Sequence, residues 1–135
     1  MKEYKKILYN LRKRGISYSL NFIFDWDAEK KDVFASTLAF LKEKKVPIAY
    51  FNILTPRKGT PLYERMKAEN RIIDIDHISR WPGLHCYIRP TYSSAQDLEQ
   101  YVKKMYREFY SYALIFARLP RPTTKANITS WMVNL

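Results

Sequence analysis

The fold class is decided by residues 46–54, which read VPIAYFNIL. This nearly continuous apolar run predicts a strand over residues 48–54 that is buried on both faces, as strands of parallel sheets are. An earlier strand is predicted at residues 16–24, ISYSLNFIF, because bulky apolar side chains alternate there with smaller or polar ones. The second face of that strand presents Ser17, Ser19, Asn21 and Ile23.

Apolar side chains at helical spacing lie between the two strands. They run from Val33 to Leu41, predict a helix that ends near Lys45, and leave Asp27 as a suitable N-cap. A strand, a helix and a second strand in this order predict a right-handed βαβ unit.

The rest of the chain predicts further helices. The first covers residues 2–14 and stops at Gly15, and a short one follows the Thr60 cap over residues 62–69. Residues 70–92 read as irregular, apart from a short strand at 84–88. Ser93 and Gln96 form a capping box for a long helix over about residues 94–118, which leaves a tail that contains Ile128, Trp131, Met132 and Val133.

Composition limits the class of protein. The chain has 135 residues, of which 47% are hydrophobic and 27% charged, which predicts one compact domain without a linker. No apolar run is long enough to cross a membrane, and the N-terminal residues lack the pattern of a secretory signal, so a cytoplasmic location is expected. The single cysteine, Cys86, cannot by itself hold a structural zinc ion or an iron–sulfur cluster.

Two interior strands are too few for a stable parallel sheet. The sequence therefore predicts either a piece of a larger α/β barrel or an oligomer that completes its sheet in trans, and we favour the first. In either case the strand at residues 17–24 is an exposed, aggregation-prone edge, so self-association is expected.

The order of these elements, together with residues 51–56 (FNILTP) and 55–61 (TPRKGTP), resembles the C-terminal half of radical S-adenosylmethionine enzymes. The resemblance is to the subgroup that often carries a cobalamin-binding domain. It covers about residues 1–118 and includes Arg71 to Ile73 and Arg89-Pro90. It implies an α/β fold in which the two strands are the fifth and sixth of a partial parallel (βα) barrel. Residues 1–70 would hold these βα units, and residues 71–135 a family-specific extension with the long helix.

The resemblance also implies cofactors and site residues. The family binds S-adenosylmethionine and a [4Fe–4S] cluster, some members use cobalamin, and the cluster motif C-x₃-C-x₂-C has no counterpart here. The family places an isoleucine against the adenine, and Ile23 occupies that position, while Asn21 and Asp25 stand at glycine positions of the family pattern. The expected cofactor-binding residues lie along the two strands and at their ends: Asn21, Ile23, Asp25, Asn52, Leu54 and Thr55.

Two hypotheses follow. In the first, the chain is the C-terminal portion of a radical S-adenosylmethionine oxidoreductase, without catalytic or metal-ligating residues of its own and inactive alone. Its partner would be the missing N-terminal half of the barrel or a second copy. In the alternative, the chain is a non-catalytic basic module that binds RNA or an acidic protein, as a net charge of +11 from 24 Lys and Arg against 13 Asp and Glu indicates.

Overall fold

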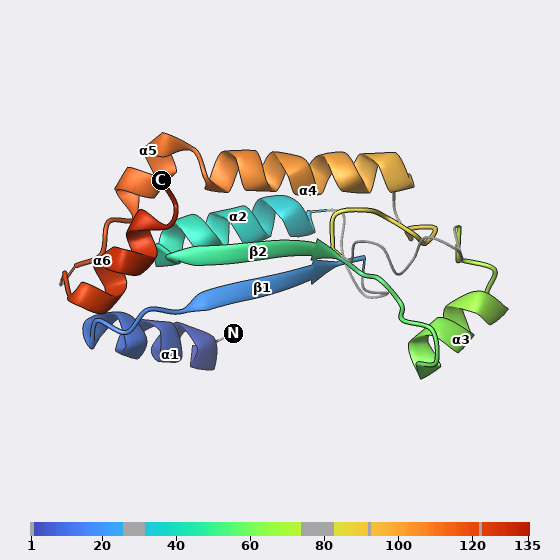
Figure 1. The fold of residues 1–135 in the computed structure, drawn as a ribbon, viewed down its shortest axis with the longest axis horizontal. Coiled ribbons are helices and arrows are strands. Elements are labelled where there is room, and N and C mark those ends of the chain that lie inside the picture. The colour runs from blue at the N-terminus through green and yellow to red at the C-terminus, as the bar shows by residue number, and fades with distance from the viewer. Residues whose placement is uncertain (1, 26–31, 74–82, 92, 122) are drawn as a thin grey trace. The chain divides into compact units, whose positions relative to one another are not determined.

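The computed structural model describes residues 2–25, 32–73, 83–91, 93–121 and 123–135. These residues form an α/β structure with two parallel strands and six helices (Figure 1). The elements are α1 (Lys2–Lys13), β1 (Ser19–Phe24), α2 (Val33–Lys44), β2 (Ile48–Ile53), α3 (Pro61–Ala68), α4 (Ala95–Phe109), α5 (Tyr112–Ala117) and α6 (Lys125–Met132). The predicted positions of the first three helices and of both strands are confirmed to within a few residues. Asp27, the predicted N-cap of α2, lies outside the described residues.

The chain divides into two compact units. The first contains residues 1–21, 34–50 and 107–135, and the second contains residues 22–33 and 51–106. The predicted division of the chain near residue 70 stays a prediction.

The sheet consists of β1 and β2 running in the same direction (Figure 1). Burial alternates along both strands: in β2 Ala49, Phe51 and Ile53 are buried, whereas Tyr50 is 49% exposed. The prediction that β2 is buried on both faces is therefore wrong. Tyr50 counts as hydrophobic in the sequence, but its side chain is half-exposed in the structure, so a continuous hydrophobic run does not imply burial on both faces.

Backbone N–H groups on the outer edge of β2 are already hydrogen bonded. Leu54 donates across the sheet to the carbonyl of Phe24, so the alternate residues of β2 direct their N–H groups away from β1. In the first unit, the N–H of Ala49 donates to the Tyr110 hydroxyl (3.3 Å), which itself donates to the carbonyl of Ala49 (2.8 Å).

The second unit continues this pattern. The N–H of Phe51 donates to the Tyr106 hydroxyl (3.0 Å), and that of Ile53 donates to the carbonyl of Gly83 (2.8 Å). The expectation that both strands of the sheet leave unpaired edges is wrong for β2. Side-chain hydroxyls and a loop carbonyl replace the neighbouring strand there.

The long C-terminal helix predicted over residues 94–118 is interrupted. Helix α4 ends at Phe109, and Ser111 has extended backbone angles before α5 begins at Tyr112. The buried guanidinium of Arg118 donates through Nη1 to the carbonyl of Phe109 at 2.6 Å, which satisfies an oxygen that the interrupted helix leaves open. Tertiary hydrogen bonding of Tyr110 and Arg118 therefore overrides a continuous helical pattern.

The capping box of α4 lies one residue later in the sequence than predicted. Ser94, not Ser93, accepts the N–H of Asp97 at 3.0 Å, and the Asp97 carboxylate accepts the N–H of Ser94 at 3.4 Å. Residues 84–88 do not form the short strand that the sequence predicts. Ile88 makes only an isolated antiparallel bridge to Ile72.

The C-terminal residues, for which the sequence predicts no helix or strand, form α6. Thr124 and Asn127 make a capping box at its start, with Asn127 in the place where Glu or Gln is usual. Thr124 also donates to the carbonyl of Gly15, and the indole N–H of Trp131 donates to the carbonyl of Ile115 at 2.8 Å. These bonds join α6 to α5 and to the end of α1 within the first unit.

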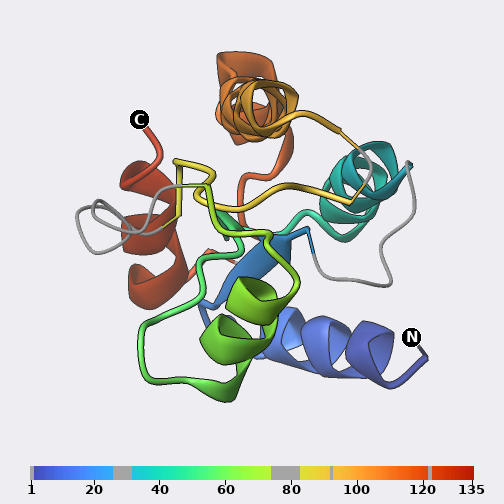
Figure 2. The ribbon, with the colours of Figure 1, turned by 90° about the vertical axis from the view of Figure 1, so that its right-hand side faces the viewer.

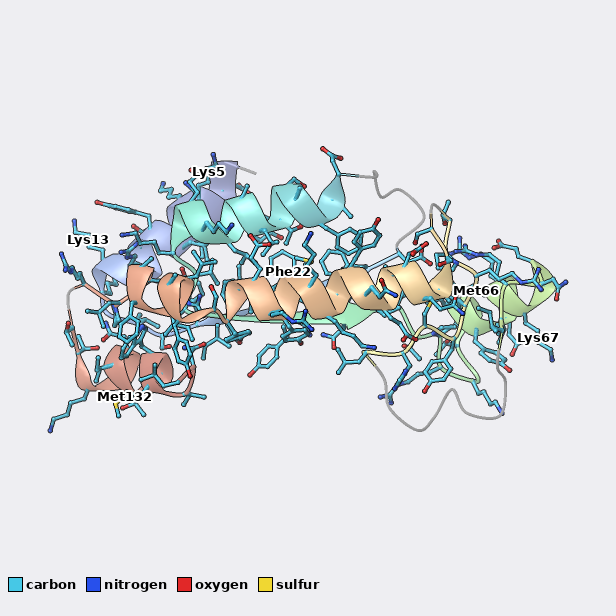
Figure 3. The ribbon with its side chains drawn as sticks, turned by 90° about the horizontal axis from the view of Figure 1, so that it is seen from above. Lys5, Lys13, Phe22, Met66, Lys67 and Met132 are labelled. Carbon is cyan, nitrogen blue, oxygen red and sulfur yellow. The ribbon has the colours of Figure 1, made fainter. Side chains whose placement is uncertain are left out.

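The second unit has a core in which Leu54, Met66 and Ile88 pack together. Met66 and its neighbour Lys67 lie on α3, where Met66 is fully buried and Lys67 is exposed (Figure 3). The cap predicted for this helix is confirmed, because Thr60 accepts the N–H of Tyr63 at 3.2 Å. Within the described part of the chain, every helix is too short or too polar to cross a bilayer.

Candidate functional site

The candidate site lies at the carboxyl ends of the two parallel strands, which face the viewer in Figure 2. Ligands of open α/β sheets bind at the carboxyl ends of the strands, so the residues at these ends are candidates for ligand binding. Five of the six predicted site residues lie here, in the second unit: Ile23, Asp25, Asn52, Leu54 and Thr55. Asn21 belongs to the first unit, where its side chain is exposed on β1.

Ile23 and Asn52 are the accessible members of this group. Ile23 is 49% exposed, although β-branched apolar side chains usually pack inside. Asn52 is half-buried, and its carboxamide oxygen lies against Gly83 so closely that a Cβ built there would come within 2.4 Å of it. With a φ of +118°, residue 83 therefore requires glycine both for its conformation and for its contact with Asn52.

Asp25 ends β1 in a left-handed conformation, with a φ of +72°. Its side chain is only 6% exposed, so its carboxylate points into the protein. The carboxylate accepts the N–H of Thr91 at 3.0 Å and pairs with Arg71 Nη2 at 3.5 Å. The charge of Asp25 is thus used to fix the loop at Thr91 against the end of the strand.

Arg71 is the second charged residue of the site, and the candidate set omits it. Beyond Asp25, its guanidinium donates to the carbonyl of Arg89 at 3.2 Å and to the Thr91 hydroxyl at 3.3 Å. The signal for it was present in the sequence, since Arg71 and Arg89 both belong to the segments that carry the family resemblance. Their proximity depends on the bridge between Ile72 and Ile88, which the sequence does not reveal.

Leu54 and Thr55 serve the structure at this edge. Leu54 is 6% exposed and packs in the core with Met66 and Ile88. The Thr55 hydroxyl donates to the carbonyl of Ile53 at 3.2 Å. Both side chains therefore stabilise the end of β2.

A cavity of about 400 Å³ lies beside α4 in the same unit, and Cys86, Arg89 and Glu99 contribute to its walls. Burial raises the pKa of the Cys86 thiol to about 11, although a hydrogen bond to the carbonyl of Ile88 opposes the shift. A thiol with such a pKa is protonated near neutral pH and is a poor nucleophile or metal ligand.

The described residues contain no group of three His, Cys, Asp or Glu side chains that could hold a metal ion. A [4Fe–4S] cluster does not fit this chain, because Cys86 is the only cysteine in the sequence. At the strand ends Ile23 is the most exposed side chain and Asn52 is half-buried, and the Asp25–Arg71 pair fixes the backbone behind them.

Two curated relatives from Chlorobaculum tepidum match the chain. Bacteriochlorophyllide d C-12(1)-methyltransferase is 29% identical over 119 residues, which are 88% of this chain and 25% of that protein. Bacteriochlorophyllide d C-8(2)-methyltransferase is 27% identical over 116 residues, which are 86% of this chain and 26% of that protein. The chain thus spans about a quarter of the length of these relatives. No family model and no solved structure matches it.

These relatives correct the functional interpretation of the sequence. They are named for methyl transfer, a different enzyme class from the radical S-adenosylmethionine oxidoreductase that the resemblance implied. The assignments to an iron–sulfur oxidoreductase and to a cobalamin-associated protein are therefore withdrawn. The relatives do not support the alternative of a basic module that binds RNA or an acidic protein either.

Proposed function

We propose that the chain is part of a methyltransferase that acts on a bacteriochlorophyllide. The observation that carries this proposal is the alignment of 88% and 86% of the chain with two enzymes that methylate bacteriochlorophyllide d. Two relatives that share a substrate and differ only in the position they methylate favour a pigment of that class as the substrate here.

S-adenosylmethionine is the methyl donor in this proposal. When bound, it supplies an electrophilic methyl group on a sulfonium. The residues at the strand ends fit one wall of a site for it, because the half-exposed Ile23 offers an apolar surface suited to a flat ring and the polar Asn52 side chain lies on the neighbouring strand. Asp25 and Arg71 act behind this wall as positioning residues, because their ion pair fixes the backbone that carries Ile23.

The larger architecture belongs to the same proposal. We infer that β1 and β2 are part of a more extensive parallel sheet, such as a partial barrel, in which Asn21, Ile23 and Asn52 share one face. The exposure of Ser19, Asn21 and Ile23 on one side of β1 supports this. A cytoplasmic location, completion by further barrel strands and self-association remain part of the proposal.

Binding of both ligands tests the proposal. We expect saturable binding of radiolabelled S-adenosylmethionine in equilibrium dialysis, and an absorbance change when bacteriochlorophyllide d is titrated with the purified protein. Transfer of the label from the methyl group to the pigment, followed by mass spectrometry, would establish the reaction. Absence of saturable binding of both ligands would overturn the proposal.

A matched pair of variants tests the site. Ile23→Lys should weaken binding of S-adenosylmethionine, because it places a charge on the proposed apolar wall. Ile73→Lys is the control, since Ile73 is an equally exposed isoleucine (51% against 49%) of the same unit that lies outside the strands. Equal loss of binding in both variants would show that Ile23 has no specific role.

A further inference from the structure

We propose that a cavity of the first unit, beside Arg118, is a binding site for a small apolar carboxylate. The cavity measures about 170 Å³, and its walls come from α2, the end of α4 and α5. This site is separate from the residues on which the proposed methyltransferase function rests, so the two stand or fall independently.

Arg118 provides the central observation. Its side chain is only 5% exposed, and no carboxylate among the described residues pairs with it. The guanidinium stacks over the Phe109 ring at 3.9 Å and lies 5.4 Å from the centre of the Tyr110 ring. A buried cation that lacks an anionic partner is costly, and burial accordingly lowers the pKa of Arg118.

Two donors of the buried Arg118 guanidinium lack a strong acceptor. Nη1 donates to the carbonyl of Phe109 at 2.6 Å, so that side is occupied. Nε has no hydrogen-bond partner among the described residues, and Nη2 reaches only the Asn134 carboxamide oxygen at 3.5 Å, the limit of a hydrogen bond. Nε and Nη2 form the edge of a guanidinium that binds a carboxylate through two parallel hydrogen bonds.

The lining of the cavity specifies the ligand further. Besides Arg118, two lysines line it: Lys42, which is paired with Glu108 at 2.6 Å, and Lys45. The remaining walls are apolar and consist of Leu41, Phe109, Leu114 and Ala117. A ligand that matches both properties has an apolar body and one carboxylate.

A second, smaller cavity strengthens the positive field. It shares Lys45 and Arg118 with the first and adds Arg12 and Arg121 to its lining. Among the described residues, no Asp or Glu lines either cavity. The basic residues thus leave an anion as the complementary charge at this place.

The size of the cavity sets the probe. Apolar cavities of roughly 150 Å³ hold a benzene-sized molecule, so benzoate is a suitable ligand and benzamide is its neutral counterpart. We expect benzoate to bind the full chain in a calorimetric titration and to shift the Arg118 Nε–H signal in a ¹H–¹⁵N spectrum. Benzamide should do neither.

Variants of the two unmatched cations complete the test. Arg118→Lys should weaken benzoate binding roughly tenfold or more, because an ammonium cannot offer the two parallel donors. Lys45→Gln should weaken it about two- to fivefold, as expected for an exposed charge near a carboxylate. Lys13→Gln is the matched control: Lys13 lies on α1 of the same unit (Figure 3), is exposed, and lines neither cavity.

The outcomes separate the site from a purely structural role of Arg118. If Arg118→Lys fails to fold, Lys45→Gln and the comparison of benzoate with benzamide still decide the question. Equal binding of benzoate and benzamide, an unshifted Arg118 Nε–H signal, or equal effects of Lys45→Gln and Lys13→Gln would overturn the proposal.

Discussion

Substitutions of Asp25 test the geometry of the strand end, because its backbone and its side chain favour different residues. The φ of +72° favours glycine, whereas the bonds of the carboxylate to Thr91 and Arg71 require aspartate. Asp25→Gly removes the carboxylate but relieves the backbone, and should lower the free energy of unfolding by about 2 kcal/mol. Asp25→Ala removes the same bonds and adds a side chain in the left-handed region, which costs about 1 kcal/mol more.

Alanine is usually more stabilising than glycine, but here the Asp25→Gly protein should have an unfolding free energy about 1 kcal/mol higher than that of the Asp25→Ala protein. Urea denaturation of the two proteins, followed by circular dichroism, measures this difference. Ile23 on the same strand supplies the control, because there Gly should be less stable than Ala by roughly 0.5–1 kcal/mol. An Asp25→Ala protein as stable as Asp25→Gly would refute the reasoning.

Three further predictions concern packing, reactivity and the sheet edge. Gly83→Ala should destabilise the protein by roughly 1–3 kcal/mol in urea, since its Cβ would lie 2.4 Å from the Asn52 oxygen at a φ of +118°; an unchanged midpoint would contradict this contact. Cys86 has a pKa of about 11 and is therefore almost entirely protonated at pH 8. It should react with Ellman's reagent roughly a hundredfold more slowly than a free thiol, and its rate should rise with pH toward 11. A rate equal to that of a free thiol would show that the Cys86 thiol is not shielded by burial. Tyr110→Phe removes both hydrogen bonds to Ala49 and should cost about 1–2 kcal/mol of unfolding free energy, whereas Tyr112→Phe, at a residue that is 71% exposed, should cost almost nothing.

Sequence periodicity predicts the elements well but not what covers them. The spacing of Tyr4, Ile7 and Leu8 correctly predicts α1, yet only Leu8 is buried and Tyr4 is 67% exposed. The reason is physical: a pattern of apolar residues reports the local conformation, whereas burial depends on which other segments pack against it.

Helix ends and breaks depend on single tertiary bonds that leave no pattern in the sequence. The interruption between α4 and α5 follows from the contacts of Arg118 with Phe109 and of Tyr110 with Ala49, which are separated by up to 61 residues in the sequence. The sequence does not predict the start of α6, because Asn127 replaces the usual Glu or Gln of a capping box.

The candidate site was predicted in part. The alternation along β1 puts Ile23 on the same side as Ser19 and Asn21, as the sequence predicts, whereas the role of these residues in binding stays a prediction. Asp25 has a positive φ, a conformation that glycine adopts most readily. The partners of Asp25 could not be predicted, because Arg71 and Thr91 reach it only through the bridge between Ile72 and Ile88.

The hydroxyls of Tyr106 and Tyr110 occupy the side of β2 at which another strand could pair. Because Ala49, Phe51 and Ile53 have already donated their N–H groups, a strand added beside β2 would have to displace two tyrosines and the carbonyl of Gly83. A strand that paired with β2 on this side would therefore have to break four hydrogen bonds before it gained any of its own, which protects the side of β2 that faces away from β1 against pairing with another chain.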